Sequence, residues 1–377
     1  MKIALFLGAG ASVPFGKPTT AELKEKLFNK YIGAVATDIF HEILFSFLTH
    51  PEFQDIEYVL QSVKELTHTL GGYGGKYLLD QTRGGYVKTG MHDVHISNFY
   101  NELKKVEKRL EDEIFESYSW KTDEDDNLFI VDDVIFSFLK EKPESIRVFT
   151  TNYDQAIERY CELKDELRLV DGFKYDENKQ KLIWADGDYS YCDKINDDKK
   201  NVYLYKLHGS LNWKEHKSGK IERTSEESVV ADPKYTANML IYPTLSPKDG
   251  YEKEPYKSIR DNFEKSMKSI DICIVIGFSF RDQHVNEILE SFIKNNKTLI
   301  IISPHAIRDY RMSLLKEHHT EEEVEHWKDT PFVKHQVEYN GIRYGTICAI
   351  QKKLEVGTVE EIVHDIKSVI EPDKHPF

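Results

Sequence analysis

Cysteine is scarce in this sequence, and no two cysteines lie close together. The four are Cys161, Cys192, Cys273 and Cys348, and none forms a CxxC pair. A zinc ribbon requires cysteine pairs at short spacing, and a disulfide framework requires a dense cysteine pattern in a small chain. The sequence therefore predicts neither, and we expect no metal site and no zinc.

Long apolar runs are also missing. The stretch "MKIALFLGAG" holds a short apolar run with one Lys before it and a glycine turn after it. A secretory signal needs a longer apolar stretch and a small-residue cleavage site, and a membrane-spanning helix needs about 20 apolar residues. We therefore expect a cytoplasmic protein that does not enter a membrane.

Basic residues form no segregated stripe. The chain has 51 Lys and Arg against 65 Asp and Glu, a net charge of −14, and its pI is about 5.6. A surface this negative repels phosphate backbones. This argues against nucleic-acid binding by the isolated chain, although an oligomer could still gather its Lys and Arg around a channel.

Apolar runs alternate with helical patterns along a chain of 377 residues, in which 40% hydrophobic content suffices for a core. A continuous run is typical of a strand buried on both faces, as in parallel sheets. Strands that alternate with helices indicate βαβ units. We therefore predict the α/β class, with a Rossmann-like doubly wound parallel sheet. Its strands are expected at 2–7, 146–151, 271–280 and 298–304, with weaker candidates at 202–209 and 343–351.

The remaining segments predict additions to this sheet. Apolar residues recur every three or four positions over 31–145, which indicates a large helical insertion. Small β-hairpin elements are expected within 165–240, where apolar residues alternate around turn residues. We predict a Rossmann domain at 1–30 plus 146–350, the insertion at 31–145 with a glycine-punctuated loop at 71–85, and a C-terminal helical extension at 351–377.

A glycine turn follows the first predicted strand and brings Gly8, Gly10 and Ser12 to its end. A phosphate needs close backbone approach and N–H donors at a helix N-terminus, and glycines permit that approach. The GxGxxG pattern is incomplete because position 13 is Val. A purely structural tight turn is therefore the alternative. Further on, "TTAE" (19–22) predicts a capping box that starts the next helix.

Two more junctions carry polar side chains. In "FTTNYDQAIE" (149–158), Asn152 and Asp154 stand where a single polar cap would suffice, so they either cap a helix or hold a ligand. In "KLHGSLNW" (206–213), His208 ends a predicted strand. It could act as a base near neutral pH, or it could be an ordinary hydrogen-bonded histidine.

A fourth junction, "IVIGFSFRDQHVNEIL" (274–289), again runs from strand through glycine and a polar turn into a helix. Gly277 allows close approach, while Ser279 and Asp282 either contact a ligand or cap the helix. All four clusters lie at carboxyl ends of predicted parallel strands. In an open α/β sheet, that edge is where ligands bind.

The combination of "GAGAS" (8–12), "TTNYD" (150–154), "LHGSLNW" (207–213) and "GFSFRDQHVN" (277–286) resembles the sirtuin-like (Sir2-like) NAD-hydrolysing family, in its bacterial anti-phage defence branch. The resemblance implies NAD as substrate and Asn152, His208 and Asp154 as catalytic residues. It implies cofactor contacts from Gly8, Ala9, Gly10, Ser12, Gly277, Ser279, Asp282 and Ser303.

The activity implied by the resemblance is that of an NAD⁺ glycohydrolase, which releases nicotinamide and ADP-ribose and depletes cellular NAD when triggered. A homo-oligomer and a helicase-type ATPase partner are implied in the same way. Three alternatives stay open: a protein deacylase, an NAD-sensing or scaffolding subunit, and a nuclease within a complex. Deacylating sirtuins carry a four-cysteine zinc module and a Phe-Arg segment after the glycine loop, and "GKPTTAEL" (16–23) has no Phe-Arg.

Overall fold

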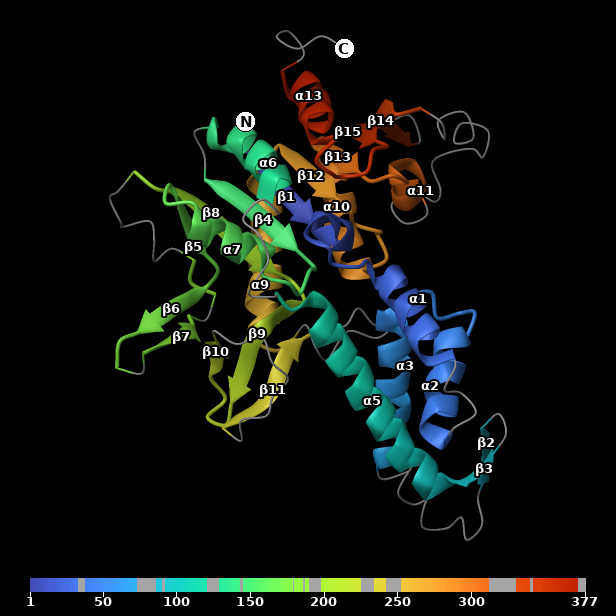
Figure 1. Cartoon of the computed structure of the whole chain (residues 1–377). Coiled ribbons are helices and arrows are strands. Elements are labelled where there is room, and N and C mark those ends of the chain that lie inside the picture. Colours follow the sequence, from blue (N-terminus) through green and yellow to red (C-terminus); the bar gives the residue numbers. More distant parts are fainter. Residues whose placement is uncertain are drawn as a thin grey trace. The chain divides into compact units, whose positions relative to one another are not determined.

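The computed structural model describes residues 1–32, 38–72, 86–89, 92–120, 129–142, 145–178, 180–185, 187–189, 198–224, 234–241, 252–311, 330–339 and 342–371. The chain divides into two compact units, whose elements are labelled in Figure 1. The first comprises Met1–Lys17, Trp120–Leu240 and Lys248–Phe377, and the second comprises Pro18–Ser119 and Ile241–Pro247. The domain boundaries expected from the sequence, at 30/31, 145/146 and 350/351, stay a prediction.

An eight-stranded sheet forms the centre of the first unit, in the order β14-β15-β13-β12-β1-β4-β8-β5. Every neighbouring pair is parallel except β14 with β15. Read in chain order, β8-β4-β1-β12-β13-β15 has the 3-2-1-4-5-6 arrangement of a dinucleotide-binding sheet. The predicted Rossmann-like α/β class is therefore confirmed. The strands are β1 (Ile3–Leu7), β4 (Ile146–Thr150), β5 (Leu167–Val170), β8 (Lys200–Lys206), β12 (Ile272–Ile276), β13 (Thr298–Ile302), β14 (Phe332–Tyr339) and β15 (Ile342–Ile350).

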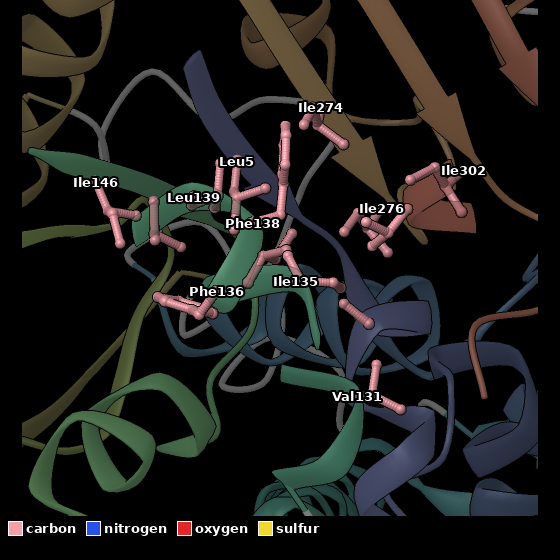
Figure 2. Close-up of a cluster of buried hydrophobic side chains, with 14 of the residues drawn as sticks. Leu5, Val131, Ile135, Phe136, Phe138, Leu139, Ile146, Ile274, Ile276 and Ile302 are labelled. Atoms are coloured by element: carbon pink, nitrogen blue, oxygen red, sulfur yellow. The ribbon is translucent and has the colours of Figure 1, made fainter. Parts of the chain in front are cut away.

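Helices cover one face of this sheet through a single apolar cluster. Figure 2 shows Ile135 and Leu139 of one helix lying with the strand side chains Leu5, Ile274 and Ile276. This helix was expected from its three- and four-residue apolar spacing. The helices on this face are α6 (Ile130–Lys140), α7 (Ala156–Leu163) and α13 (Val359–Ile370). Helix α13 thus packs its apolar face against the core of its own unit.

The opposite face is covered as well, which explains why the strands read as continuous apolar runs. Phe6 of β1 and Phe149 of β4 pack on Phe263, with ring centroids 5.7 and 4.6 Å away. Phe263 belongs to α9 (Tyr256–Ser269), which contacts α10 (Gln283–Lys294). Both β1 and β12 are buried along their whole length because both faces are occupied. The unit also contains a 3-10 helix, η1 (Ala9–Phe15), and α11 (Ala306–Arg311).

A second, antiparallel sheet of the first unit confirms the predicted hairpins. Its order is β11-β9-β10-β7-β6. Trp213 lies fully buried in it, with its ring 5.0 Å from that of Phe173 and 6.3 Å from that of Trp184. The strands are β6 (Phe173–Asp176), β7 (Lys181–Trp184), β9 (Gly209–His216), β10 (Ile221–Arg223) and β11 (Tyr235–Leu240).

The second unit is a group of amphipathic helices with one short hairpin. The predicted capping box is present at its start, since Thr19 Oγ1 accepts from Glu22 N (3.2 Å) and Thr19 N donates to Glu22 Oε2 (2.7 Å). Most of the loop expected at 71–85 lies outside the described residues. The elements are α1 (Thr20–Tyr31), α2 (Ile39–Thr49), α3 (Ile56–Gly71), β2 (Tyr86–Thr89), β3 (His92–His95) and α5 (Ile96–Tyr118).

The loops after β1 and β12 meet backbone to backbone at the point where the strand order reverses. Gly10 N donates to Gly277 O over 2.9 Å. Gly277 has a φ of 62°, and a Cβ built on it would lie 2.5 Å from both Gly10 Cα and Ala11 N. No side chain can be placed there without moving the main chain, so this contact requires glycine.

We expect Gly277→Ala to destabilise the chain by more than the roughly 1–2 kcal/mol of a left-handed backbone alone, because the new methyl group also meets main-chain atoms. Gly16→Ala is the matched control, since Gly16 has a φ of 71° and no atom within 4 Å of the added carbon. Urea unfolding of both variants measures the difference. Equal losses would show that the contact between the two loops is not tight.

Candidate functional site

The register of the parallel strands places their carboxyl ends at one level. Leu7 pairs with Thr150 on one side and with Ile276 on the other. Thr150 in turn pairs with Lys206, and Ile276 pairs with Ile302. The segments that leave this rim are the ones that carry Gly8, Asn152, His208, Gly277 and Ser303. The expectation that these residues follow adjacent strand ends is therefore confirmed.

Three of the predicted site residues form a hydrogen-bond relay. Ser12 Oγ donates to Asp154 Oδ2 over 2.6 Å. Asn152 Nδ2 donates to Ser12 Oγ (2.8 Å) and to the carbonyl oxygen of Gly8 (2.9 Å). Asp154 Oδ1 accepts from Ala156 N (3.0 Å) at the start of α7. The relay ties the segment after β4 to the glycine turn after β1.

The relay also determines which way the Asn152 amide faces. A carboxylate only accepts hydrogen bonds, so the Ser12 hydroxyl must donate to Asp154. The Ser12 oxygen then accepts, and Asn152 must offer its NH₂ group to it. Both amide hydrogens have protein acceptors, which leaves Oδ1 as the atom through which half-buried Asn152 can accept from a ligand.

His208 pairs with a carboxylate from another element. Its Nε2 lies 2.7 Å from Asp282 Oδ2, and both side chains are buried. The other oxygen, Asp282 Oδ1, accepts from His284 N (2.9 Å) and Val285 N (3.2 Å) and so caps α10. The Tyr153 ring, between Asn152 and Asp154 in the chain, lies 6.5 Å from the imidazole. The imidazole therefore lies beside the segment that carries the relay.

The glycine turn uses part of its own hydrogen-bonding capacity. Gly8 N donates to Ile276 O and Gly10 N to Gly277 O, each over 2.9 Å. Ala9, like Gly10, is half-buried. A phosphate held by this turn would therefore rely on donors other than the amides of Gly8 and Gly10.

Two predicted cofactor residues lie apart from the relay. Ser303 Oγ donates to Asp309 Oδ2 (2.7 Å) and accepts from His305 N (3.1 Å), so its hydroxyl builds the turn after β13. Burial raises the pKa of the Asp309 carboxyl. Ser279 is exposed in the turn after β12.

A buried ion pair, Lys206 with Glu158, lies next to the relay. Lys206, at the end of β8, donates to Glu158 Oε1 over 2.9 Å and to the carbonyl oxygen of Asp154. Both side chains are almost inaccessible, with relative exposures of 1% and 4%. Burial raises the pKa of Glu158, and the Lys206 ammonium opposes that rise. The pair joins β8 to α7 and holds the backbone of Asp154.

The sequence analysis missed Asp132, a buried acid of α6. Its Oδ2 has no hydrogen-bond partner in the described part of the chain. Burial, with smaller contributions from the charges of Asp133 and Asp154, raises its pKa from 3.8 to about 8. A signal was present, because Asp132 precedes buried Ile135 and Phe136 by three and four positions and so shares their apolar face.

Asp132 lines a cavity of about 30 Å³, which is enough for one water molecule. Asn152, Asp154 and Ser12 line the same cavity, so the relay borders it. The other polar lining side chains are Thr150, Glu158 and Lys206.

Metal and membrane features were searched in the described ranges alone. No group of three or more His, Cys, Asp or Glu side chains there is arranged to hold a metal ion. Cys161, Cys273 and Cys348 are buried free thiols, and Cys192 lies outside those ranges. Among the helices described, none has both the length and the apolar character needed to cross a membrane.

Comparison with known proteins gives a match over part of the chain. Residues 146–332 match the family model described as a SIR2-like domain. The matched segment includes Asn152, Asp154, His208 and Asp282. A search of curated proteins found no match.

Among solved structures, a mutant Sir2 homologue in complex with 2'-O-acetyl ADP ribose is similar at 12% identity and a TM-score of 0.40, covering 98% of this chain and 93% of the other. A Sir2 homologue in complex with NAD is similar at 10% identity and a TM-score of 0.38, covering 98% and 90%. The fold assignment rests on the strand order and register of the sheet.

We expect Lys206→Met to lower the free energy of unfolding by about 3–5 kcal/mol, because it leaves the Glu158 carboxylate buried without its cation. Lys140→Met is the control: its partner Glu166 is half exposed, and such a pair contributes at most about 1 kcal/mol. Adding Glu158→Gln to Lys206→Met should recover much of the loss. Denaturant unfolding that shows similar losses for the two Lys variants would contradict this prediction.

We expect Asp132→Asn to stabilise the chain increasingly as the pH rises from about 4 to 8. The folded state holds the proton up to a pKa of about 8, whereas the unfolded carboxyl releases it near 3.8. Wild-type stability from this group is therefore full below about pH 4 and is lost by up to about 1.4 kcal/mol per pH unit above it. The Asn side chain has no such loss. Unfolding curves of both proteins at several pH values test this, and a pH-independent difference would refute it.

Proposed function

We propose that the chain is an NAD⁺ glycohydrolase that cleaves the bond between nicotinamide and ribose and releases ADP-ribose. Two observations support the proposal. One is the match of residues 146–332 to the model of a SIR2-like domain. The other is the polar rim at the reversal point of a 3-2-1-4-5-6 sheet, where dinucleotides bind.

The observation that carries the proposal is the fixed orientation of Asn152. The nicotinamide of NAD⁺ is a cationic leaving group, and its departure leaves positive charge on the ribose. A site accelerates this step with oriented dipoles that are in place before the charge develops. The relay through Ser12 presents Asn152 Oδ1, the negative end of the amide dipole, to a bound ligand. It thus offers a preorganised acceptor for a ribose hydroxyl or a water.

His208 supplies the base in this proposal. It takes a proton from a ribose hydroxyl or from the attacking water, a role suited to imidazole near neutral pH. Asp154 has both carboxylate oxygens engaged by Ser12 and Ala156. We therefore assign it to holding the relay and the start of α7, together with the carboxamide contact that the resemblance implies.

The proposed biological setting rests on the resemblance to the sirtuin-like family. Unrestrained NAD⁺ hydrolysis would kill the host, so the activity must be gated. We propose that the chain is an anti-phage defence effector that depletes NAD when triggered, and that it works as a homo-oligomer with a helicase-type ATPase partner. Nicotinamide release measured with the chain alone and with candidate partners tests this gating.

We expect Asn152→Ala and His208→Ala each to lower the rate of nicotinamide release by about 100-fold or more, because each removes a positioned polar group. Release of nicotinamide and ADP-ribose from NAD⁺ is measured by chromatography, under the conditions in which the wild-type chain is active.

Asn201→Ala and His216→Ala are the matched controls. Asn201 lies near the start of β8, at the end opposite the rim, and His216 ends β9. Both variants should keep wild-type turnover. Full activity of Asn152→Ala and His208→Ala would refute the assignment, and release of nicotinamide only when an acylated peptide is present would favour the deacylase.

A further inference from the structure

We propose that Asp282 is a positioning residue that holds the His208 imidazole with its proton on Nε2 and its lone pair on Nδ1. Its catalytic consequence rests on the proposed function, in which His208 is the base. The sequence analysis left Asp282 as a ligand contact or a helix cap, and the resemblance implied a cofactor contact. The structure shows the cap and adds a partner within the protein.

The two carboxylate oxygens of Asp282 have separate duties. Oδ1 accepts from the amides of His284 and Val285 in the first turn of α10, while Oδ2 lies 2.7 Å from His208 Nε2. The carboxylate cannot turn towards the imidazole or away from it without losing the helix cap. The helix N-terminus also favours an anion at this position. Asp282 is therefore held in place as an acceptor.

A fixed acceptor determines the tautomer of the imidazole. Asp282 as a carboxylate cannot donate a hydrogen bond, so the hydrogen between it and His208 must sit on Nε2. In the neutral ring the lone pair is then on Nδ1. The side chains of His208 and Asp282 are 2% and 5% exposed, so bulk water competes little with this arrangement. The contact joins residues 74 positions apart, which means that the tertiary structure creates it.

The chain contains a comparison pair with the same chemistry. Asp38 caps α2 through His41 N and also lies 2.9 Å from His41 Nδ1. This pair is local, three residues apart, and the Asp38 side chain is 53% exposed. It lies in the second unit, outside the SIR2-like segment. Asp38→Asn thus makes the same Asp-to-Asn change as Asp282→Asn, but at a residue of the second unit.

Asp282→Asn separates the cap from the tautomer. The Asn oxygen can still cap α10, since Asn and Asp are equally good caps. Its NH₂ group then faces His208 and donates, so Nε2 must accept and the proton must move to Nδ1. The helix stays intact while the base loses its lone pair on Nδ1.

The test is ¹⁵N NMR of the full chain labelled at histidine ring nitrogens, with the His208 signals identified by their loss in His208→Ala. We expect the Nε2–H form in the wild type and the Nδ1–H form in Asp282→Asn, with no change in Asp38→Asn. A wild-type Nδ1–H form overturns the proposal even if the Asp282→Asn variant fails to fold. An unchanged Nε2–H form in a folded Asp282→Asn variant also overturns it.

The kinetic readout follows on the same proteins. We expect Asp282→Asn to lower kcat for nicotinamide release by about 10- to 100-fold with KM little changed, and Asp38→Asn to leave both unchanged. An unchanged kcat in Asp282→Asn overturns the positioning role. If the wild type releases no nicotinamide under any condition, the proposed function fails, while the NMR result still decides whether Asp282 sets the tautomer.

Discussion

The hydrogen bond from Ser12 to Asp154 is the contact on which the rim depends. It fixes the hydroxyl direction, and through it the direction of the Asn152 amide. It also links the segments that follow two strands, because Ser12 comes after β1 and Asp154 after β4. A buried carboxylate is costly unless its hydrogen bonds are satisfied, and here Ser12 and Ala156 satisfy both oxygens. The hydrogen bonds that offset the cost of burying the Asp154 carboxylate therefore also orient Ser12 and Asn152.

Several buried polar side chains lie next to this contact. Lys206 and Glu158 form an ion pair under Asp154, and Asp132 borders the same small cavity. Replacing this ion pair with well-packed apolar side chains would leave the free energy of unfolding unchanged or raise it, since a buried ion pair rarely adds much to stability. The ion pair instead fixes the backbone of Asp154, because Lys206 also donates to the Asp154 carbonyl oxygen. We infer that rigidity at this junction is what the buried polar groups provide.

Much of the fold could be predicted because the signals were local. Continuous apolar runs identified β1, β4, β12 and β13, and the capping box fixed the start of α1. The strand ends then placed Asn152 and His208 on one rim. The partners of these residues could not be predicted, because the contacts of Asn152 with Ser12 and of His208 with Asp282 cross 140 and 74 positions. Asp132 was missed, although its spacing from Ile135 and Phe136 places it on the apolar face of a helix.

The sequence by itself determined where the main strands and helices lie along the chain, since a strand buried on both faces is a continuous apolar run and an amphipathic helix has apolar residues every three or four positions. It also determined which residue types stand at strand ends. Only the tertiary structure decided which partners those residues have: Asp154 accepts from Ser12, Asp282 lies beside His208, and Ser303 donates to Asp309 in its own turn. The physical reason is that a polar side chain can hydrogen-bond whatever folding brings within about 3 Å, and sequence spacing does not encode that distance.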